Sequence, residues 1–159
     1  MISFTVEETG WLFERPDLEA AVVPAVQEGT ELAYSHVRGL LAAHRGPGTY
    51  GHAAEAVGRE TRHAAGVGIT GRVFGRGRSK FKLVFLEFGT KGRGRVEPKR
   101  ARGMLAFRPG GGGGGELIFR KSVRNAPTPA FHMFEQTSRD TEPRVLGLIE
   151  DAIRQVAEQ

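Results

Sequence analysis

One stretch of the chain decides the fold, and it reads Phe81-Lys82-Leu83-Val84-Phe85-Leu86-Glu87-Phe88-Gly89-Thr90. Its first six residues are mostly apolar and include aromatic and β-branched side chains, which favours a strand. Gly89 follows and allows a sharp turn, because glycine adopts backbone angles that other residues avoid. Glu87 is the only acid in the segment. We expect it to pair with a nearby arginine or to cap the turn, with a general acid as the remaining option.

A basic segment with several glycines follows, and we interpret it as a projecting arm at about residues 91–102. Six of its side chains are cationic: Lys91, Arg93, Arg95, Lys99, Arg100 and Arg102. Such side chains contact phosphates without reading base sequence, and they also dock on acidic protein surfaces. Few aromatic residues lie among them, so stacking on single-stranded bases is not supported. Three roles stay open: contact with a neighbouring subunit, contact with DNA in a channel, and a solvated loop.

Two more strand-like runs follow the arm, at residues 104–108 and 116–123. Six consecutive glycines lie between them, and glycine-rich segments behave as flexible chains. The sequence therefore predicts a hairpin with a flexible loop at about residues 109–115. Pro127 and Pro129 then hold the chain extended, because the residue before a proline avoids the helical region. A helical turn or short helix is expected to follow at residues 130–137.

Upstream of the deciding stretch, the pattern predicts a strand and a long helix. Ile2 to Val6 alternates apolar and polar residues, which is typical of a strand. From Asp17 to His44, apolar residues recur at steps of three and four, which is typical of a helix with one apolar side. Pro24 lies inside this helix and lacks the N–H of a helical hydrogen bond, so we expect a kink or a restart of the helix there.

The segments between these elements predict a short helix and a second long strand. Residues 49–62 have a small apolar side that suits a short helix. Residues 63–74 are expected to form a strand that pairs with residues 81–88.

The C-terminal part predicts a final helix that begins at Pro143, where a missing N–H costs nothing. Its apolar residues form a stripe that is expected to cover one face of the sheet: Val145, Ile149, Ala152, Ile153 and Val156. The predicted fold class is α+β, with a small antiparallel sheet packed by a long N-terminal helix and a C-terminal helix. Extended basic and glycine-rich loops complete it. A length of 159 residues suits one domain, residues 1–159.

Charge is segregated along the chain. Residues 1–35 carry seven acids and one base, residues 71–102 carry eleven bases and two acids, and residues 135–159 carry six acids and three bases. A basic middle between acidic ends attracts a polyanion such as DNA. It equally orients docking on the acidic surface of another copy.

The composition and the motifs argue against several functional classes. The chain has no cysteine, so it holds neither a disulfide nor a thiolate zinc site. No apolar run approaches the roughly 20 residues that span a membrane, and the first residues do not resemble a secretion signal. The histidines lack metal-binding spacing, no serine lies in a Gly-x-Ser-x-Gly turn, and the glycine motifs do not lead from a strand into a helix. We therefore expect no enzyme, no metal and no cofactor.

The order of the central pieces resembles the neck or tail-completion family of long-tailed phages and phage-like particles. In that family, a Glu-Phe-Gly-Thr-like turn, here Glu87 to Thr90, precedes a hairpin. A Pro-Ala-Phe-like approach to the C-terminal helices, here Pro129 to Phe131, comes next. The resemblance covers roughly Thr49 to the C-terminus. Tyr50-Gly51 stands after Thr49 where the family has a Thr-Gly-like turn.

The resemblance implies a structural virion protein of the head–tail junction, which forms a ring around the DNA channel. Its partners would be copies of itself, six or twelve in a ring, together with head-connector and tail-tube or tail-terminator proteins. It would assemble in the host cytoplasm and reside in the virion neck. Six phenylalanines are expected to provide core or anchor packing: Phe85, Phe88, Phe107, Phe119, Phe131 and Phe134.

The charge pattern alone supports a different class of protein. A basic segment of this density also suits a free-standing module that binds nucleic acid without sequence preference. Such binding would weaken steeply with salt, because it depends on contacts with phosphates.

Overall fold

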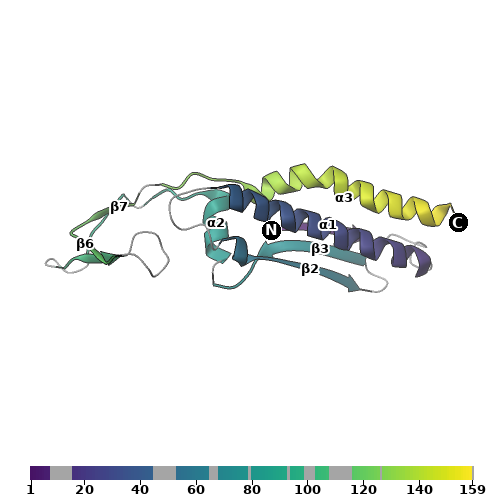
Figure 1. Ribbon diagram of the computed structural model, residues 1–159, viewed down its shortest axis with the longest axis horizontal. Helices are drawn as coiled ribbons and strands as arrows, with labels where there is room; N and C mark the ends of the chain where they lie inside the picture. The colour runs from purple at the N-terminus through teal and green to yellow at the C-terminus, as the bar shows by residue number, and fades with distance from the viewer. Residues whose placement is uncertain are drawn as a thin grey trace.

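The computed structural model describes residues 1–7, 16–44, 53–64, 68–78, 80–92, 94–98, 103–107, 116–125 and 127–158. The fold is α+β, as the sequence predicted, with a small antiparallel sheet and long N-terminal and C-terminal helices. Figure 1 shows two parts: a body of long helices alongside a sheet, and an arm of short strands that extends from one end of it.

A three-stranded antiparallel sheet forms the base of the body, in the order β1-β3-β2. The strands are β1 (Ile2–Glu7), β2 (Val57–Ala64) and β3 (Gly68–Gly75). On the central strand, Ile69 and Val73 are buried. Because side chains alternate along a strand, these residues share one face of the sheet, and this face packs against the helices.

The long helix α1 (Pro16–Ala43) packs on this face, chiefly over β2 and β3. It continues through Pro24, so the expectation of a restart there is wrong. Its buried side includes Val26, Ala33 and Val37, as the sequence predicted. The buried Thr30 hydroxyl donates a hydrogen bond to the carbonyl of Val26 at 2.7 Å.

The predicted short helix at residues 49–62 is wrong for its described part. Only a single 3₁₀ turn, η2 (Ala54–Ala56), precedes strand β2. The strand has few apolar residues, because its helix-facing positions contact α1 through polar groups. Arg59 Nε lies 2.6 Å from Glu31 Oε2, and its guanidinium lies over the Tyr34 ring.

The segment that the sequence predicted as a strand is a helix, α2 (Lys80–Phe88). Leu83, Leu86 and Glu87 are buried at helical spacing. The predicted pairing of residues 63–74 with residues 81–88 is also wrong, because β3 pairs with β1 and β2. A short apolar run does not separate strand from helix by periodicity alone, and α2 is apolar on both of its sides.

The C-terminal helix α3 (Met133–Ala157) is continuous, so the prediction that a helix begins at Pro143 is wrong. Its buried Val145 faces Gly29 of α1, where an added Cβ would lie only 2.8 Å from a Val145 methyl group. The helix packs mainly along α1 and touches the sheet only slightly at β1. Most of the predicted stripe therefore faces α1 and does not lie across the sheet, while Ile153 of the stripe is exposed.

Two short antiparallel ribbons form the arm. Strand β4 (Gly94–Val96) pairs with β7 (Val123–Asn125), and β5 (Leu105–Phe107) pairs with β6 (Ile118–Arg120). The second pair confirms the predicted hairpin, whose glycine-rich connection lies outside the described residues. Neither ribbon makes more than slight contact with the helices or the sheet of the body (Figure 1).

Candidate functional site

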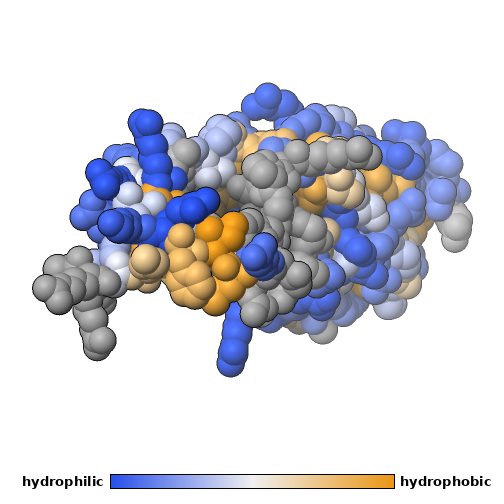
Figure 2. Space-filling view, turned by 60° about the vertical axis from the view of Figure 1, so that its left-hand side comes forward, coloured by the Kyte–Doolittle hydropathy of each residue, from blue (hydrophilic) through white to orange (hydrophobic). Residues whose placement is uncertain are grey.

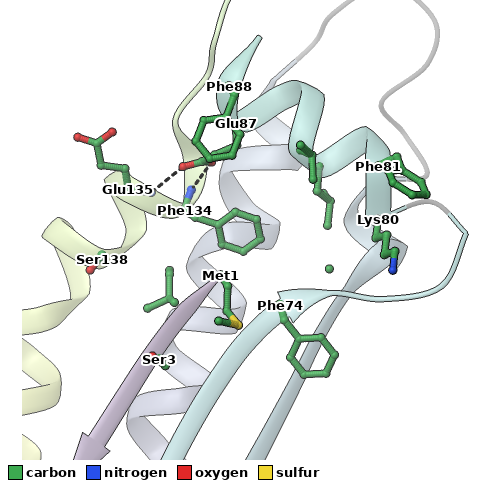
Figure 3. A pocket seen from close by; sticks show the side chains of 14 residues that line it. Met1, Ser3, Phe74, Lys80, Phe81, Glu87, Phe88, Phe134, Glu135 and Ser138 are labelled. Atoms are coloured by element: carbon green, nitrogen blue, oxygen red, sulfur yellow. Dashed lines mark hydrogen bonds between the residues drawn. The ribbon is translucent and has the colours of Figure 1, made fainter. Parts of the chain in front are cut away.

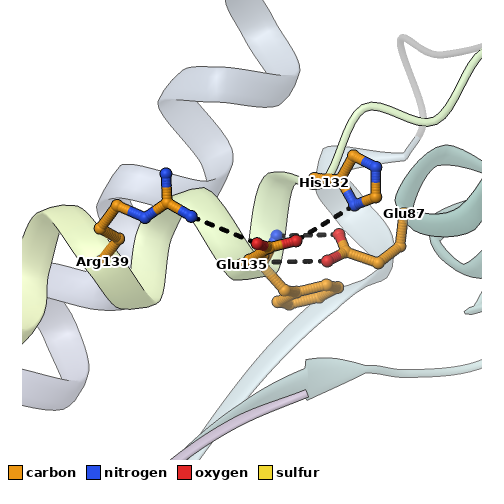
Figure 4. A network of polar contacts seen from close by, with 5 residues as sticks. Glu87, His132, Glu135 and Arg139 are labelled. Carbon is orange, nitrogen blue, oxygen red and sulfur yellow. Dashed lines mark hydrogen bonds and ion pairs between the residues drawn. The ribbon is translucent and has the colours of Figure 1, made fainter.

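The arm and the body meet at a joint built on Glu87. Its carboxylate accepts hydrogen bonds from the backbone N–H groups of Phe134 at 2.9 Å and Glu135 at 3.2 Å (Figure 4). These groups belong to the first turn of α3, where backbone N–H groups lack helical partners and the helix dipole favours a negative charge. Among the residues that the structure describes, Glu87 therefore has neither the expected arginine partner nor a capping contact with the Gly89 turn. Glu87 caps a helix that begins far along the chain.

The chain leaves the body and returns to it through paired backbone segments. Thr90 and Thr128 exchange two backbone hydrogen bonds, at 2.8 and 3.2 Å. Gly89 has φ +70°, and an added Cβ would lie 2.7 Å from the Thr128 carbonyl oxygen, so glycine is required there. Close by, the N–H of Phe131 donates to the carbonyl of Leu86 at 2.6 Å. The Glu-Phe-Gly-Thr and Pro-Ala-Phe motifs thus pack against each other at the root of the arm.

A second polar cluster surrounds the exposed Glu135. Its carboxylate lies 3.2 Å from His132 Nδ1 and 3.3 Å from an Arg139 guanidinium nitrogen (Figure 4). All three side chains are more than half exposed. Exposed pairs of this kind contribute at most about 1 kcal/mol. This cluster therefore adds little to the stability of the joint.

A hollow of about 800 Å³ lies between the start of β1, α2 and the start of α3. Figure 3 shows Met1, Phe81, Phe88 and Phe134 around it, with Glu87 at its edge. Burial lowers the pKa of the Met1 amino group, and the nearby Glu87 carboxylate opposes that shift. The lining is mostly apolar, so the hollow suits apolar side chains better than a charged ligand.

The outer side of α2 exposes large apolar side chains beside this hollow. The exposed fractions are 60% for Phe81, 47% for Val84, 52% for Phe85 and 74% for Phe88. Figure 2 brings this end of the molecule forward and shows apolar surface gathered there among hydrophilic side chains. Apolar side chains scattered singly on a surface are ordinary, but contiguous ones mark contact sites.

The six candidate phenylalanines divide into different environments. Phe134 is buried, and Phe131 is half-buried with its ring 4.2 Å from that of His44. Phe85, Phe88 and Phe119 are more than half exposed, so the core role is wrong for them within a single chain. Only the anchor role towards a partner remains open for these three. The Phe107 side chain lies outside the described residues.

Two of the six basic candidates are described, and both are exposed: Lys91 and Arg95. Arg95 Nε lies 3.0 Å from Glu97 Oε1. Arg93, Lys99, Arg100 and Arg102 lie outside the described residues. The sequence reasoning missed Arg124, which lies directly across the β4–β7 ribbon from Arg95. Arg124 closes a short basic run, Arg120-Lys121-Ser122-Val123-Arg124, at the end of the predicted hairpin. This run was the sequence signal that could have marked Arg124 as a candidate.

Neither metal chemistry nor a membrane span is indicated within the part of the chain that the structure describes. No group of three histidine or carboxylate side chains there is arranged to hold a metal ion. His36 instead joins α1 to α3, since its Nδ1 lies 3.0 Å from the Thr137 hydroxyl oxygen and its Nε2 lies 3.5 Å from an Asp140 oxygen. None of the described helices combines the length and the apolar character that crossing a bilayer requires.

Comparison of this chain with protein-family models, with curated proteins and with solved structures finds no significant match.

Proposed function

We propose that this chain is a structural subunit of the head–tail junction in a tailed phage or phage-like particle. Copies of it would form a ring around the DNA channel and connect the head connector to the tail tube. The chain would act there as a building block and not as an enzyme, with the virion as its final location.

The observation that carries this proposal is the joint between the Glu87 turn and the start of α3. The residues that resemble the neck family, Glu87 to Thr90 and Pro129 to Phe131, lie far apart in the sequence but pack against each other at the root of the arm, where a Cβ on Gly89 would lie 2.8 Å from Ala130 N. Hydrogen bonds at the edges of the two motifs hold them together, from Thr90 to Thr128, from Phe131 to Leu86 and from Phe134 to Glu87. A motif that fixes a projecting arm to a compact body suits a protein that reaches towards neighbours.

The surface chemistry supports the same function. Apolar side chains are exposed on α2, where this chain offers them no cover. An assembly subunit buries such surface when it meets its partners. The basic middle and the acidic ends of the chain also suit a ring, because ring closure requires two different faces that attract each other.

The proposal is tested by co-expressing the chain with the head-connector and tail-tube proteins of its particle. Electron microscopy of the purified assemblies is expected to show closed rings between connector and tube. The variant Phe88→Asp places a charge on the exposed side of α2 and should abolish incorporation. Arg154→Asp, an exposed change on the last turn of α3, is the matched control and should leave it intact. A protein that stays monomeric and is absent from every assembled particle would overturn the proposal.

A second candidate function is sequence-independent binding of nucleic acid. It is favoured by the cross-strand pair of Arg95 and Arg124, since like charges directly opposite each other destabilise a ribbon, and the nearby Glu97 carboxylate pairs with only one of the two, Arg95. The double variant Arg95→Ala with Arg124→Ala should then weaken duplex binding and flatten its salt dependence, by about 0.9 in the logarithmic slope per lost phosphate contact. If this variant loses assembly and keeps its affinity for DNA, the second candidate fails.

A further inference from the structure

The arm carries an apolar face that its own body does not cover. In the β5–β6 ribbon, Phe119 lies opposite Ala106. Met104 and Leu117 stand just outside the two strands, two residues before Ala106 and Phe119, and a continuation of the two-residue alternation would place them on the same side. The three large side chains are 45–59% exposed. An isolated two-stranded ribbon is at best marginally stable in water, so this one gains most by packing on another surface.

The body also carries an exposed apolar surface, which lies beside the root of the arm. The hollow beside α2 is lined by Phe81, Val84 and Phe88, whose side chains are all exposed. Phe88 immediately precedes the root of the arm at Gly89, and the ribbons lead away from that root (Figure 1). The apolar face and the hollow therefore lie apart within one chain, so the ribbon does not fill the hollow of its own copy.

Charge favours the same occupant. The described part of the arm has five bases and two acids, and the bases are Lys91, Arg95, Arg120, Lys121 and Arg124. Helix α3 starts at the hollow and continues as a segment with six acids and three bases over residues 133–158. Opposite net charges orient the arm of one copy along the body of the next. The charged phosphates of a nucleic acid make no favourable contact with the apolar side chains of Met104, Leu117 and Phe119. A protein surface therefore fits this face better than a nucleic acid does.

We propose that the apolar face of the β5–β6 ribbon in one copy fills the hollow beside α2 in the next copy. The inference rests on the proposed function, because the ring is what this contact would build. The contact joins two different surfaces and is therefore heterologous, so it leads to a ring when the rotation between copies closes.

The test uses the fact that the chain has no cysteine, so introduced thiols report only the intended positions. One variant carries Phe119→Cys on the ribbon, and the other carries Val84→Cys in the hollow. The two purified proteins are mixed under mild oxidation and analysed by non-reducing electrophoresis and mass spectrometry. A disulfide requires the two Cα atoms to come within about 7 Å. We expect a mixed dimer that contains one copy of each variant, and no dimer from either variant alone.

A matched control replaces the hollow position with Ile153→Cys. Ile153 is also exposed, but it lies near the C-terminal end of α3, at the far end of the body from α2 (Figure 1). Mixing this variant with Phe119→Cys should give no dimer. Phe88→Cys serves as a second hollow position, so that the result does not depend on the folding of one variant.

Two results would overturn the inference. One is the absence of a mixed dimer at both hollow positions, and the other is a dimer of Phe119→Cys with itself, which would indicate a symmetric contact between arms. If no mixed dimer forms while the chain still builds rings in particles, the contact fails and the proposed function stands. If the mixed dimer forms and the chain is absent from head–tail junctions, the contact stands and the proposed function fails.

Discussion

The Glu87 carboxylate accepts a hydrogen bond from the backbone N–H of Phe134 at 2.9 Å, across 47 positions of sequence. The whole arm lies between these two residues. The cap therefore ties the segment before the arm to the helix after it, and it fixes the place where the arm leaves the body.

Replacing the capping side chain should destabilise the fold. Glu87→Ala leaves two backbone N–H groups of the first turn of α3 without a partner, so we expect a loss of about 1–3 kcal/mol in the free energy of unfolding. Glu87→Gln keeps an acceptor and should lose less. Urea denaturation followed by circular dichroism measures both. Glu135→Ala is the control, because this exposed carboxylate makes only exposed ion pairs. An equal loss for Glu135→Ala would contradict the capping role.

The turn at Gly89 should not tolerate a side chain. Gly89→Ala combines φ +70° with a Cβ only 2.7–2.8 Å from backbone atoms of Thr128 and Ala130. We expect a loss of about 2 kcal/mol or more, since strained backbone alone costs about 1–3 kcal/mol. Gly94→Ala is the matched control, because Gly94 has φ +65° but no atom within 4 Å of the added Cβ. The difference between the two melting temperatures isolates the close packing, and equal shifts would refute it.

The crossing of α1 and α3 depends on a small residue at position 29. Gly29→Ala places a methyl group 2.8 Å from Val145, and overpacking of this kind costs about 1–3 kcal/mol. Adding Val145→Ala makes room, so the double variant should be more stable than the sum of the two single losses predicts. A double-mutant cycle of denaturation midpoints measures this coupling.

A control for this pair lies on α3 itself. Gly147→Ala adds a methyl group with no atom within 4 Å. It should stabilise the protein by up to about 1 kcal/mol through helix propensity. A loss of stability at both glycines would indicate that crowding at Val145 is not the cause.

Substitutions at two neighbouring residues of α2 should change the stability of the protein by very different amounts. Leu86→Ala removes a fully buried side chain and should cost about 2–5 kcal/mol. Phe85→Ser changes a side chain that is 52% exposed, so stability should stay within about 0.5 kcal/mol. Thermal unfolding compares the two, and a large loss for Phe85→Ser would mean that this side of α2 is covered within the single chain.

The parts of the fold that the sequence predicted are those with strong periodicity. Helix α1 repeats apolar residues over many turns, and β1 alternates clearly, so both were found close to their true bounds. Strand β2 was missed because its helix-facing Arg59 and His63 pair with acids of α1 and leave no apolar signal. Such pairs depend on the tertiary arrangement, which a local pattern does not contain.

The α2 segment misled the sequence reasoning for a different reason. Its run of apolar residues is typical of a buried strand, because Phe81, Val84, Phe85 and Phe88 look like core residues. They are instead exposed, and only Leu83, Leu86 and Glu87 point inward. The joint was foreseeable only in part, because the sequence marked Glu87 and Gly89 as special without revealing that their partners lie after the arm.

The paired backbones of Thr90 and Thr128 have a topological consequence. Everything between them is an insertion whose two ends are neighbours, so the rest of the chain would close with a short turn in its place. A segment anchored in this way can be lengthened, shortened or exchanged without changing the interior of the body. A foreign hairpin could likewise be grafted onto the body between Thr90 and Thr128.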